Sequence, residues 1–178
     1  KWRWELNDPT PELRIRSAHI VGVRGFTPRI AVSGPLAANK LFISQSTEFR
    51  LNKVPTFALQ FPNNEERRQS VNTFTQLDWI PTASQFVTLT LHGVPQRVQN
   101  ANPSFYNPIA TTPDSRGHEY RTALSHSFNR GQALFLTNLS AQETGAEVWP
   151  KGDLPFVMTP TGNQGSYFLE QYRQRHGT

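Results

Sequence analysis

The stretch that decides the fold covers residues 55–93 and reads PTFALQFPNNEERRQSVNTFTQLDWIPTASQFVTLTLHG. Residues 57–61 alternate apolar and polar side chains, which is the two-residue period of a strand with one buried face. Residues 86–91 alternate in the same way. The stretch therefore predicts a strand near each of its ends.

Between these strands the sequence has the signals of an amphipathic helix. Asn63 or Asn64 is suited to the N-cap position, and two glutamates follow where negative charge favours the helix dipole. Val71, Phe74 and Leu77 then form an apolar stripe at helical spacing. A proline after the stripe ends the predicted helix.

The same order of signals returns near the C-terminus, where residues 153–175 read DLPFVMTPTGNQGSYFLEQYRQR. An apolar strand, a closing proline and a polar turn precede a second predicted helix at about residues 161–175. In both stretches an apolar pair follows the closing proline by nine and twelve residues: Val71 and Phe74, then Leu169 and Tyr172. The repeat predicts an α+β fold with two antiparallel β-sheets of about four strands, each followed by an amphipathic helix.

The rest of the chain predicts turns and strands around this plan. Residues 118–127 and 132–139 flank a turn and predict a β-hairpin, and residues 95–113 predict a long loop. Short strands at 147–149 and 154–158 complete the second half. Residues 1–12, with two tryptophans, are predicted to form an N-terminal arm, and residues 13–178 a single domain.

Composition excludes several kinds of site. The 178 residues contain no cysteine, so disulfides, thiolate catalysis and cysteine-ligated zinc are excluded. No apolar run approaches the roughly 20 residues that a membrane helix needs, and we expect no membrane partner. No signal or transit peptide is visible in the sequence.

The distribution of charge favours an anionic partner. The net charge is +5, and residues 13–60 alone hold seven basic residues against one acidic residue, Glu48. In the predicted strands these basic residues alternate with apolar ones, as one wet face of an antiparallel sheet requires. Such a face can follow a phosphate backbone. The candidate RNA-binding residues are Arg14, Arg16, Arg24, Arg29, Lys40, Arg50, Lys53, Arg97, Arg116, Arg121 and Arg130.

Enzymatic motifs for nucleophile elbows, phosphate loops and dinucleotide sites do not occur in the sequence. His118 and His126 share a strand face by parity, but eight residues of strand separate them by roughly 26 Å, too far for one metal. We therefore expect no enzyme, no catalytic residues, no metal site and no cofactor. A small nuclease built around His118 and Glu119 remains an alternative.

Three short segments carry a resemblance to a known family. FALQFP at residues 57–62, FYNP at 105–108 and DSRG at 114–117 resemble segments of the Whirly-type single-stranded nucleic-acid-binding proteins, and the similarity spans residues 19–175. The lysine-rich motif of the plant members is missing, and VRGFTPR stands at residues 23–29. The chain is more similar to the trypanosomatid mitochondrial guide-RNA-binding proteins of that fold.

This resemblance implies a function and a location. It implies a sequence-nonspecific RNA-annealing protein of the mitochondrial matrix that holds guide RNA by its phosphates and promotes its pairing with pre-mRNA in RNA editing. A related paralogous subunit would complete a heterotetramer. The alternative is a structural protein with a β-sandwich, such as a viral coat or decoration protein. Helix content separates the two, because a sandwich should have nearly none.

Overall fold

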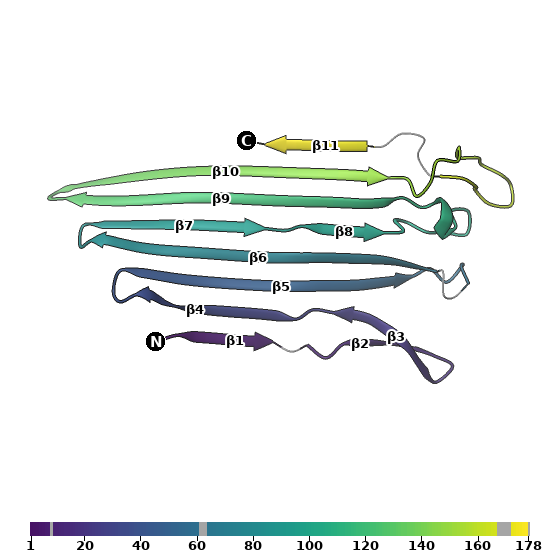
Figure 1. Cartoon of the computed structure of the whole chain (residues 1–178), viewed down its shortest axis with the longest axis horizontal. Coiled ribbons are helices and arrows are strands. Elements are labelled where there is room, and N and C mark those ends of the chain that lie inside the picture. Colours follow the sequence, from purple (N-terminus) through teal and green to yellow (C-terminus); the bar gives the residue numbers. More distant parts are fainter. Residues whose placement is uncertain (8, 61–63, 167–171, 178) are drawn as a thin grey trace.

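The computed structural model of the chain describes residues 1–7, 9–60, 64–166 and 172–177, the last of these as backbone. Within them the regular structure is one antiparallel sheet of 11 strands and a single short 3-10 helix (Figure 1). The elements are β1 (Arg3–Asn7), β2 (Glu12–Arg16), β3 (His19–Phe26), β4 (Arg29–Ala37), β5 (Leu41–Pro55), β6 (Glu65–Thr82), β7 (Gln85–Gly93), β8 (Gln96–Gln99), η1 (Ile109–Thr111), β9 (Asp114–Arg130), β10 (Ala133–Trp149) and β11 (Tyr172–Gly177).

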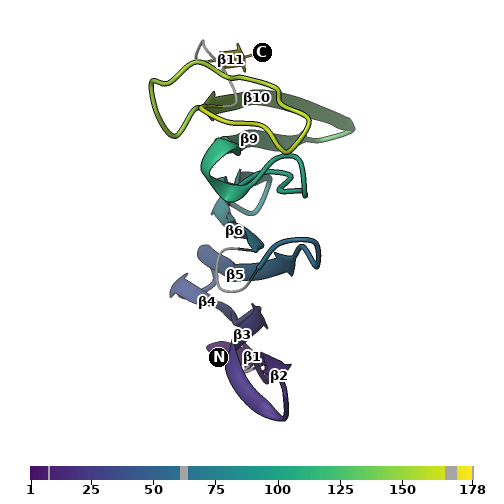
Figure 2. The ribbon, with the colours of Figure 1, turned by 90° about the vertical axis from the view of Figure 1, so that its right-hand side faces the viewer.

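The strands follow a meander with two additions. Their order across the sheet is β1-β4-β5-β6-β7-β9-β10-β11. The β2–β3 hairpin pairs with the end of β5 beyond β4, and β8 continues the line of β7 between β6 and β9. Figure 2, which looks at the molecule from the loop end, shows the strands stacked above one another in a single layer from β2 to β11.

The predicted α+β fold with two amphipathic helices is wrong, because the described residues hold no helix of seven residues or more. Residues 65–79 pair with the whole of β5 instead of coiling. Val71 and Leu77 belong to an alternating set that continues through Thr73, Thr75 and Trp79, and β-branched side chains of this kind favour strands. The two-residue period of a strand therefore describes this segment, and the helical stripe of Val71, Phe74 and Leu77 does not.

The second predicted helix fails in the same way. Residues 161–166 are irregular. Gln164 forms an isolated bridge with Val157, and the backbone N–H groups of Asn163 and Ser166 donate to the carbonyls of Tyr106 and Leu154. Residues 172–177 form strand β11, and residues 167–171 lie outside the described residues. Because neither predicted helix forms in the described residues, the predicted duplication of a sheet-then-helix unit is also wrong.

Other expectations have mixed outcomes. The hairpin at residues 118–139 is confirmed as part of β9 and β10, and Gly131 supplies the positive φ of 62° in its turn. The predicted strand at 57–61 is wrong for its described part, since residues 56–60 are irregular. The predicted loop at 95–113 contains β8 and η1, and β10 continues unbroken through Trp149. From the predicted arm, residues 3–7 form β1 and pair with β4.

The described part of the sheet has no hydrophobic core, because none of its aliphatic or aromatic side chains is buried. The buried residues are five polar ones, Asn64, Glu66, Thr111, Thr112 and Ser166, together with Gly93, Pro113 and Gly145. The accessible surface is 12604 Å² for 20.2 kDa. A compact monomer of this mass exposes about 8,800 Å², so the chain exposes about 3,800 Å² more than a self-contained domain.

Candidate functional site: the apolar face and its charged edge

The register of the strands brings apolar residues into one row across the sheet. Ile43 lies opposite Leu77, Leu77 opposite Leu89, Leu89 opposite Leu124, and Leu124 opposite Leu139. Directly paired residues project from the same side of a sheet, so these five side chains form one continuous apolar row over β5, β6, β7, β9 and β10. We call them the leucine row.

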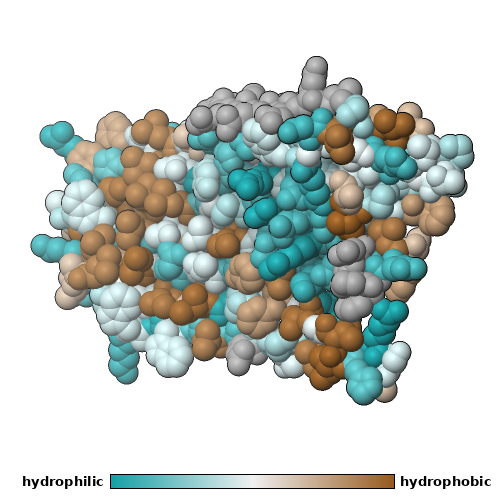
Figure 3. All heavy atoms as spheres, turned by 45° about the vertical axis from the view of Figure 1, so that its right-hand side comes forward, coloured by the Kyte–Doolittle hydropathy of each residue, from teal (hydrophilic) through white to brown (hydrophobic). Residues whose placement is uncertain are grey.

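The side of the sheet that carries the leucine row is the apolar face. By register and alternation it also carries Trp4, Leu6, Ile30, Val32, Leu41, Phe49, Leu51, Val71, Trp79, Val87, Leu91, Phe128 and Phe135. Phe128 and Phe135 stack with ring centroids 6.1 Å apart. Figure 3 shows hydrophobic residues over the left part of the molecule, interspersed with polar ones.

Some polar side chains on the apolar face bond to one another. Gln45 donates through Nε2 to Thr47 Oγ1 at 3.1 Å and to Thr73 Oγ1 at 3.0 Å, and its Oε1 accepts from Thr75. Because these groups are already paired, covering them with a medium that forms no hydrogen bonds costs little. Thr122, His126 and Thr137 also project from this side.

The opposite side, which we call the polar face, carries mostly polar side chains together with Phe42, Phe74, Phe86, Leu134 and Leu136. One residue along from the leucine row, the same strands place Ser44, Gln76, Thr90, Ala123 and Ser140 opposite one another. Asp78 on this face accepts from Thr88 Oγ1 at 2.8 Å and from Gln76 Nε2. An antiparallel sheet with one polar and one apolar face is built to be wet on one side only.

The apolar face ends at a charged edge near the loops. Arg97 on β8 lies directly opposite Arg116 on β9, and Arg67 on β6 projects nearby from the same side. Arg97 Nη2 meets Asp114 Oδ2 at 3.5 Å. The Nε atoms of Arg67 and Arg97 are buried and have no hydrogen-bond partner among the described residues. Figure 3 shows a hydrophilic patch right of centre.

An open hollow of about 410 Å³ lies beside this charged edge. Its walls include Phe49 and Val71 from the apolar face, Arg116, and the stacked rings of His118 and Tyr120, whose centroids are 5.2 Å apart. His118 Nε2 lies 3.6 Å from Glu143 Oε1. The hollow therefore joins an apolar floor to a guanidinium group.

Three further cationic side chains hold the loops at this end. Arg14 Nη1 donates to Glu65 Oε2 at 2.5 Å, and Lys53 Nζ lies 3.6 Å from the other oxygen of Glu65. Lys151 Nζ donates to the carbonyl of Ile109 at 2.9 Å and to Thr112 Oγ1 at 3.1 Å. Burial lowers the pKa of the Lys151 amino group from its ordinary 10.5, while the charge of Asp114 acts to raise it.

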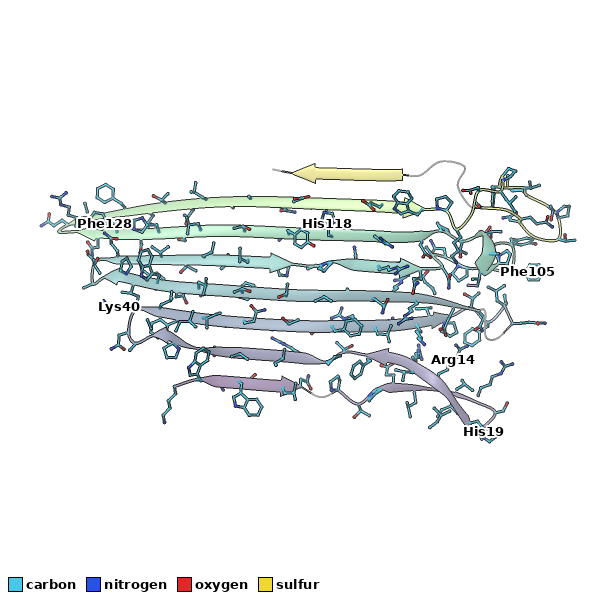
Figure 4. The ribbon with its side chains drawn as sticks, viewed as in Figure 1. Arg14, His19, Lys40, Phe105, His118 and Phe128 are labelled. Carbon is cyan, nitrogen blue, oxygen red and sulfur yellow. The ribbon has the colours of Figure 1, made fainter. Side chains whose placement is uncertain are left out.

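The structure distributes the candidate RNA-binding residues over both faces and both ends of the strands. Arg29, Arg50 and Arg121 lie on the polar face, and Lys53, Arg97 and Arg116 lie on the apolar face. Arg14, Arg16 and Arg24 lie on the β2–β3 hairpin. Lys40 and Arg130 lie at the turns of the opposite end; Figure 4 labels Arg14 and Lys40 at these two ends. Arg14, Arg50, Lys53, Arg97 and Arg121 are in ion pairs with described residues.

The structure brings together only one subset of these residues away from the sheet faces. Arg14, Arg16 and Arg24 line a hollow of about 710 Å³ together with Phe57. By contrast, His118 and Glu119 project from opposite faces of β9, so they do not form one site. Among the residues that the structure describes, no group of three His, Asp or Glu side chains could hold a metal ion.

Sequence reasoning missed the leucine row. The alternation in β7 was visible, but only the pairing register shows that its leucines meet those of β6, β9 and β10. Within the described chain, no helix is long and apolar enough to cross a membrane.

Comparisons with models of protein families, with curated proteins and with solved structures find no match to this chain.

Proposed function

We propose that this chain is a lipid-facing sheet, whose apolar face lies against membrane hydrocarbon while its polar face stays wet. The leucine row carries the proposal: five apolar side chains meet in register across five strands and none of them is buried. Exposed apolar patches on soluble monomers rarely exceed a few hundred Å², so a face of this extent needs a cover.

The extent of the apolar face suits a lipid layer. From Phe128 to Tyr120, strand β9 advances eight residues, about 27 Å. The hydrocarbon core of a bilayer is about 30 Å thick. Trp79 and Tyr120, which prefer the boundary between hydrocarbon and headgroups, lie toward the two limits of this span.

The abrupt change from apolar to basic residues at one end of the apolar face favours lipid over a second protein layer as its cover. In a β-sandwich the inner face is apolar along the whole strand, because another sheet covers it. Here β6, β8 and β9 change within a few residues from Val71 and Tyr120 to Arg67, Arg97 and Arg116. Basic residues at such a boundary match anionic headgroups.

Flotation with neutral phosphatidylcholine vesicles tests the proposal. Leu124 and Ser125 are neighbours on opposite faces of β9, so Leu124→Lys and Ser125→Lys add the same charge at the same depth. A lysine in hydrocarbon costs about 3 kcal/mol, so Leu124→Lys should weaken vesicle binding on the order of a hundredfold. Ser125→Lys should bind like the unmodified chain.

Two results would contradict the proposal. One is a chain that does not float with vesicles, or that responds equally to both lysines. The other is a discrete lipid-free dimer, measured by analytical ultracentrifugation, that Leu124→Lys alone disrupts. That result would identify a second copy of the chain as the cover.

RNA binding is a second candidate, and one observation favours it. Arg14, Arg16 and Arg24 line the 710 Å³ hollow beside Phe57, whose side chain is 95% exposed. Guanidinium groups match phosphate oxygens, and an exposed ring can stack a base. In this proposal the hollow holds guide RNA by its backbone and leaves its bases available for pairing with pre-mRNA.

A filter-binding titration at several salt concentrations tests this candidate. The variant Arg16→Gln/Arg24→Gln should weaken binding to unrelated RNA sequences equally and reduce the salt slope by about 0.7 for each lost phosphate contact. The variant Arg29→Gln/Arg50→Gln removes the same charge from the polar face and should have a smaller effect. A flat salt response, or a strong preference for one sequence, would exclude this candidate.

A further inference from the structure

We propose that Arg67, Arg97 and Arg116 form a binding subsite for the phosphate of an anionic phospholipid at the charged edge of the apolar face. This inference rests on the proposed lipid-facing function and names the class of lipid. The subsite and the apolar face would hold the two ends of one lipid molecule.

The register of the strands places the three arginines close to one another. Arg97 and Arg116 face each other directly on neighbouring strands, and like charges in that position repel. Arg67 projects from the same side of β6, one alternation away from Gln69, which pairs with Arg97. Three guanidinium groups are thus held within one small area by the sheet itself.

The carboxylates nearby satisfy this cluster only in part. Asp114 reaches Arg97 through Nη2 at 3.5 Å, at the limit of a hydrogen bond. Glu65 is engaged by Arg14 and Lys53. Glu147, opposite Arg116, accepts the indole N–H of Trp149 at 3.2 Å.

The cluster also holds two donor atoms without partners. The Nε atoms of Arg67 and Arg97 are both buried without a hydrogen-bond partner in the described part of the chain. Buried polar groups normally have partners, so two such donors in one cluster are unusual. A phosphate has several acceptor oxygens and accepts two parallel hydrogen bonds from one guanidinium fork.

The adjoining hollow explains why the phosphate should belong to a lipid. The hollow of about 410 Å³ is lined by Arg97 and Arg116 and also by Phe49, Val71 and Tyr120. An acyl chain leaving a phosphate at the arginines would lie on these apolar side chains and continue toward the leucine row. A free phosphate would leave that apolar surface uncovered.

Flotation with three kinds of vesicle separates the possible sources of binding. The vesicles contain phosphatidylcholine alone, phosphatidylcholine with phosphatidylglycerol, or phosphatidylcholine with oleate at the same charge density. The unmodified chain should prefer phosphatidylglycerol to both other compositions. In Arg97→Gln/Arg116→Gln this preference should fall on the order of tenfold or more, since each arginine near an anionic surface contributes about fivefold.

The controls separate this inference from the proposed function. Arg29→Gln/Arg50→Gln removes the same charge from the polar face and should keep the preference. Far-UV circular dichroism checks that each variant keeps its strand content. Binding of Arg97→Gln/Arg116→Gln to phosphatidylcholine alone should not change.

Each outcome supports or overturns the inference. Loss of the phosphatidylglycerol preference only in Arg97→Gln/Arg116→Gln supports it. An unchanged preference in that variant, or equal binding to oleate and phosphatidylglycerol vesicles, overturns the subsite and leaves the lipid-facing function standing. A chain that binds no vesicle of any composition overturns both.

Discussion

Arg97 and Arg116 lie directly opposite each other on β8 and β9, with both side chains on the apolar face. Cross-strand pairs of like charge destabilise a sheet by a few tenths of a kcal/mol to about 1 kcal/mol. Arg116 also lies directly opposite Glu147 on β10, so a double-mutant cycle is needed to isolate the repulsion. Arg97→Gln should be more favourable to the free energy of unfolding by about 0.5 kcal/mol in the chain with Arg116 than in Arg116→Gln, as measured by urea titration without phospholipid.

The matched control for this change is Arg121→Gln on the same strand. Arg121 projects from the polar face and is in an ion pair with Glu119, so its loss should leave stability unchanged or slightly lower. If Arg97→Gln has the same effect in the Arg116→Gln background as in the Arg121→Gln background, the opposition of Arg97 and Arg116 carries no energetic penalty.

Gly34→Ala should release the N-terminal strand. A Cβ at Gly34 would lie 2.5 Å from the indole of Trp2, so the ring must move away from β4. Tryptophan fluorescence should shift to the red, and backbone amides of β1 should exchange faster with solvent. Ser33→Ala, on the adjacent residue and the opposite face, should leave both signals unchanged.

Glu66→Gln should destabilise the loop end of the sheet. The Glu66 carboxylate is only 4% exposed, accepts the backbone N–H of Asn102 at 2.8 Å and is in an ion pair with Arg68. Weakening a buried, charged acceptor costs about 2 kcal/mol, measurable by urea unfolding. Glu5→Gln removes a carboxylate from an exposed pair with Arg3, and its cost should stay below about 1 kcal/mol.

The unfolding free energy should depend on pH through Lys151. Burial lowers the pKa of this amino group in the folded chain, whereas the unfolded chain keeps the ordinary value of 10.5. Between the lowered value and 10.5 the unfolded state binds more protons, so stability rises as pH increases through that window. Below the window the cost of burying the charge is fully present.

Comparison with Lys151→Gln isolates this contribution. The difference in unfolding free energy between the unmodified chain and Lys151→Gln should move in favour of the unmodified chain as pH approaches 10.5. A difference that stays constant across the alkaline range would show that Lys151 is equally solvated in the folded and unfolded states.

The sequence was sufficient to predict individual strands but not how they are arranged in the sheet. The alternation of Arg50 against Phe49 and Leu51 predicts two faces for β5, and the pairing with β6 confirms it. The hairpin around Gly131 was predictable because its turn needs a residue that tolerates positive φ. Such local signals do not depend on what the strand finally packs against.

The errors arose where two periods fit the same residues. Val71, Phe74 and Leu77 match a helical stripe, while Val71, Thr73, Thr75 and Leu77 match a strand, and the strand is decided by pairing with β5. The basic residues were expected on one face of the sheet. The alternation within one strand shows which of its residues share a face, but the register with the next strand decides which residues of that strand lie on the same face. The leucines meet across strands because of the pairing register, and no single segment of the sequence encodes that register.

The outer strands of the sheet have a consequence for assembly. In the described chain β1 pairs only with β4, and β11 pairs only with β10, so each leaves one side of its backbone without a ladder partner. Amide groups of that kind recruit any extended peptide that can align with them. The sheet can therefore be extended by another strand at β1 and at β11. A polypeptide that pairs there would continue both the polar and the apolar face.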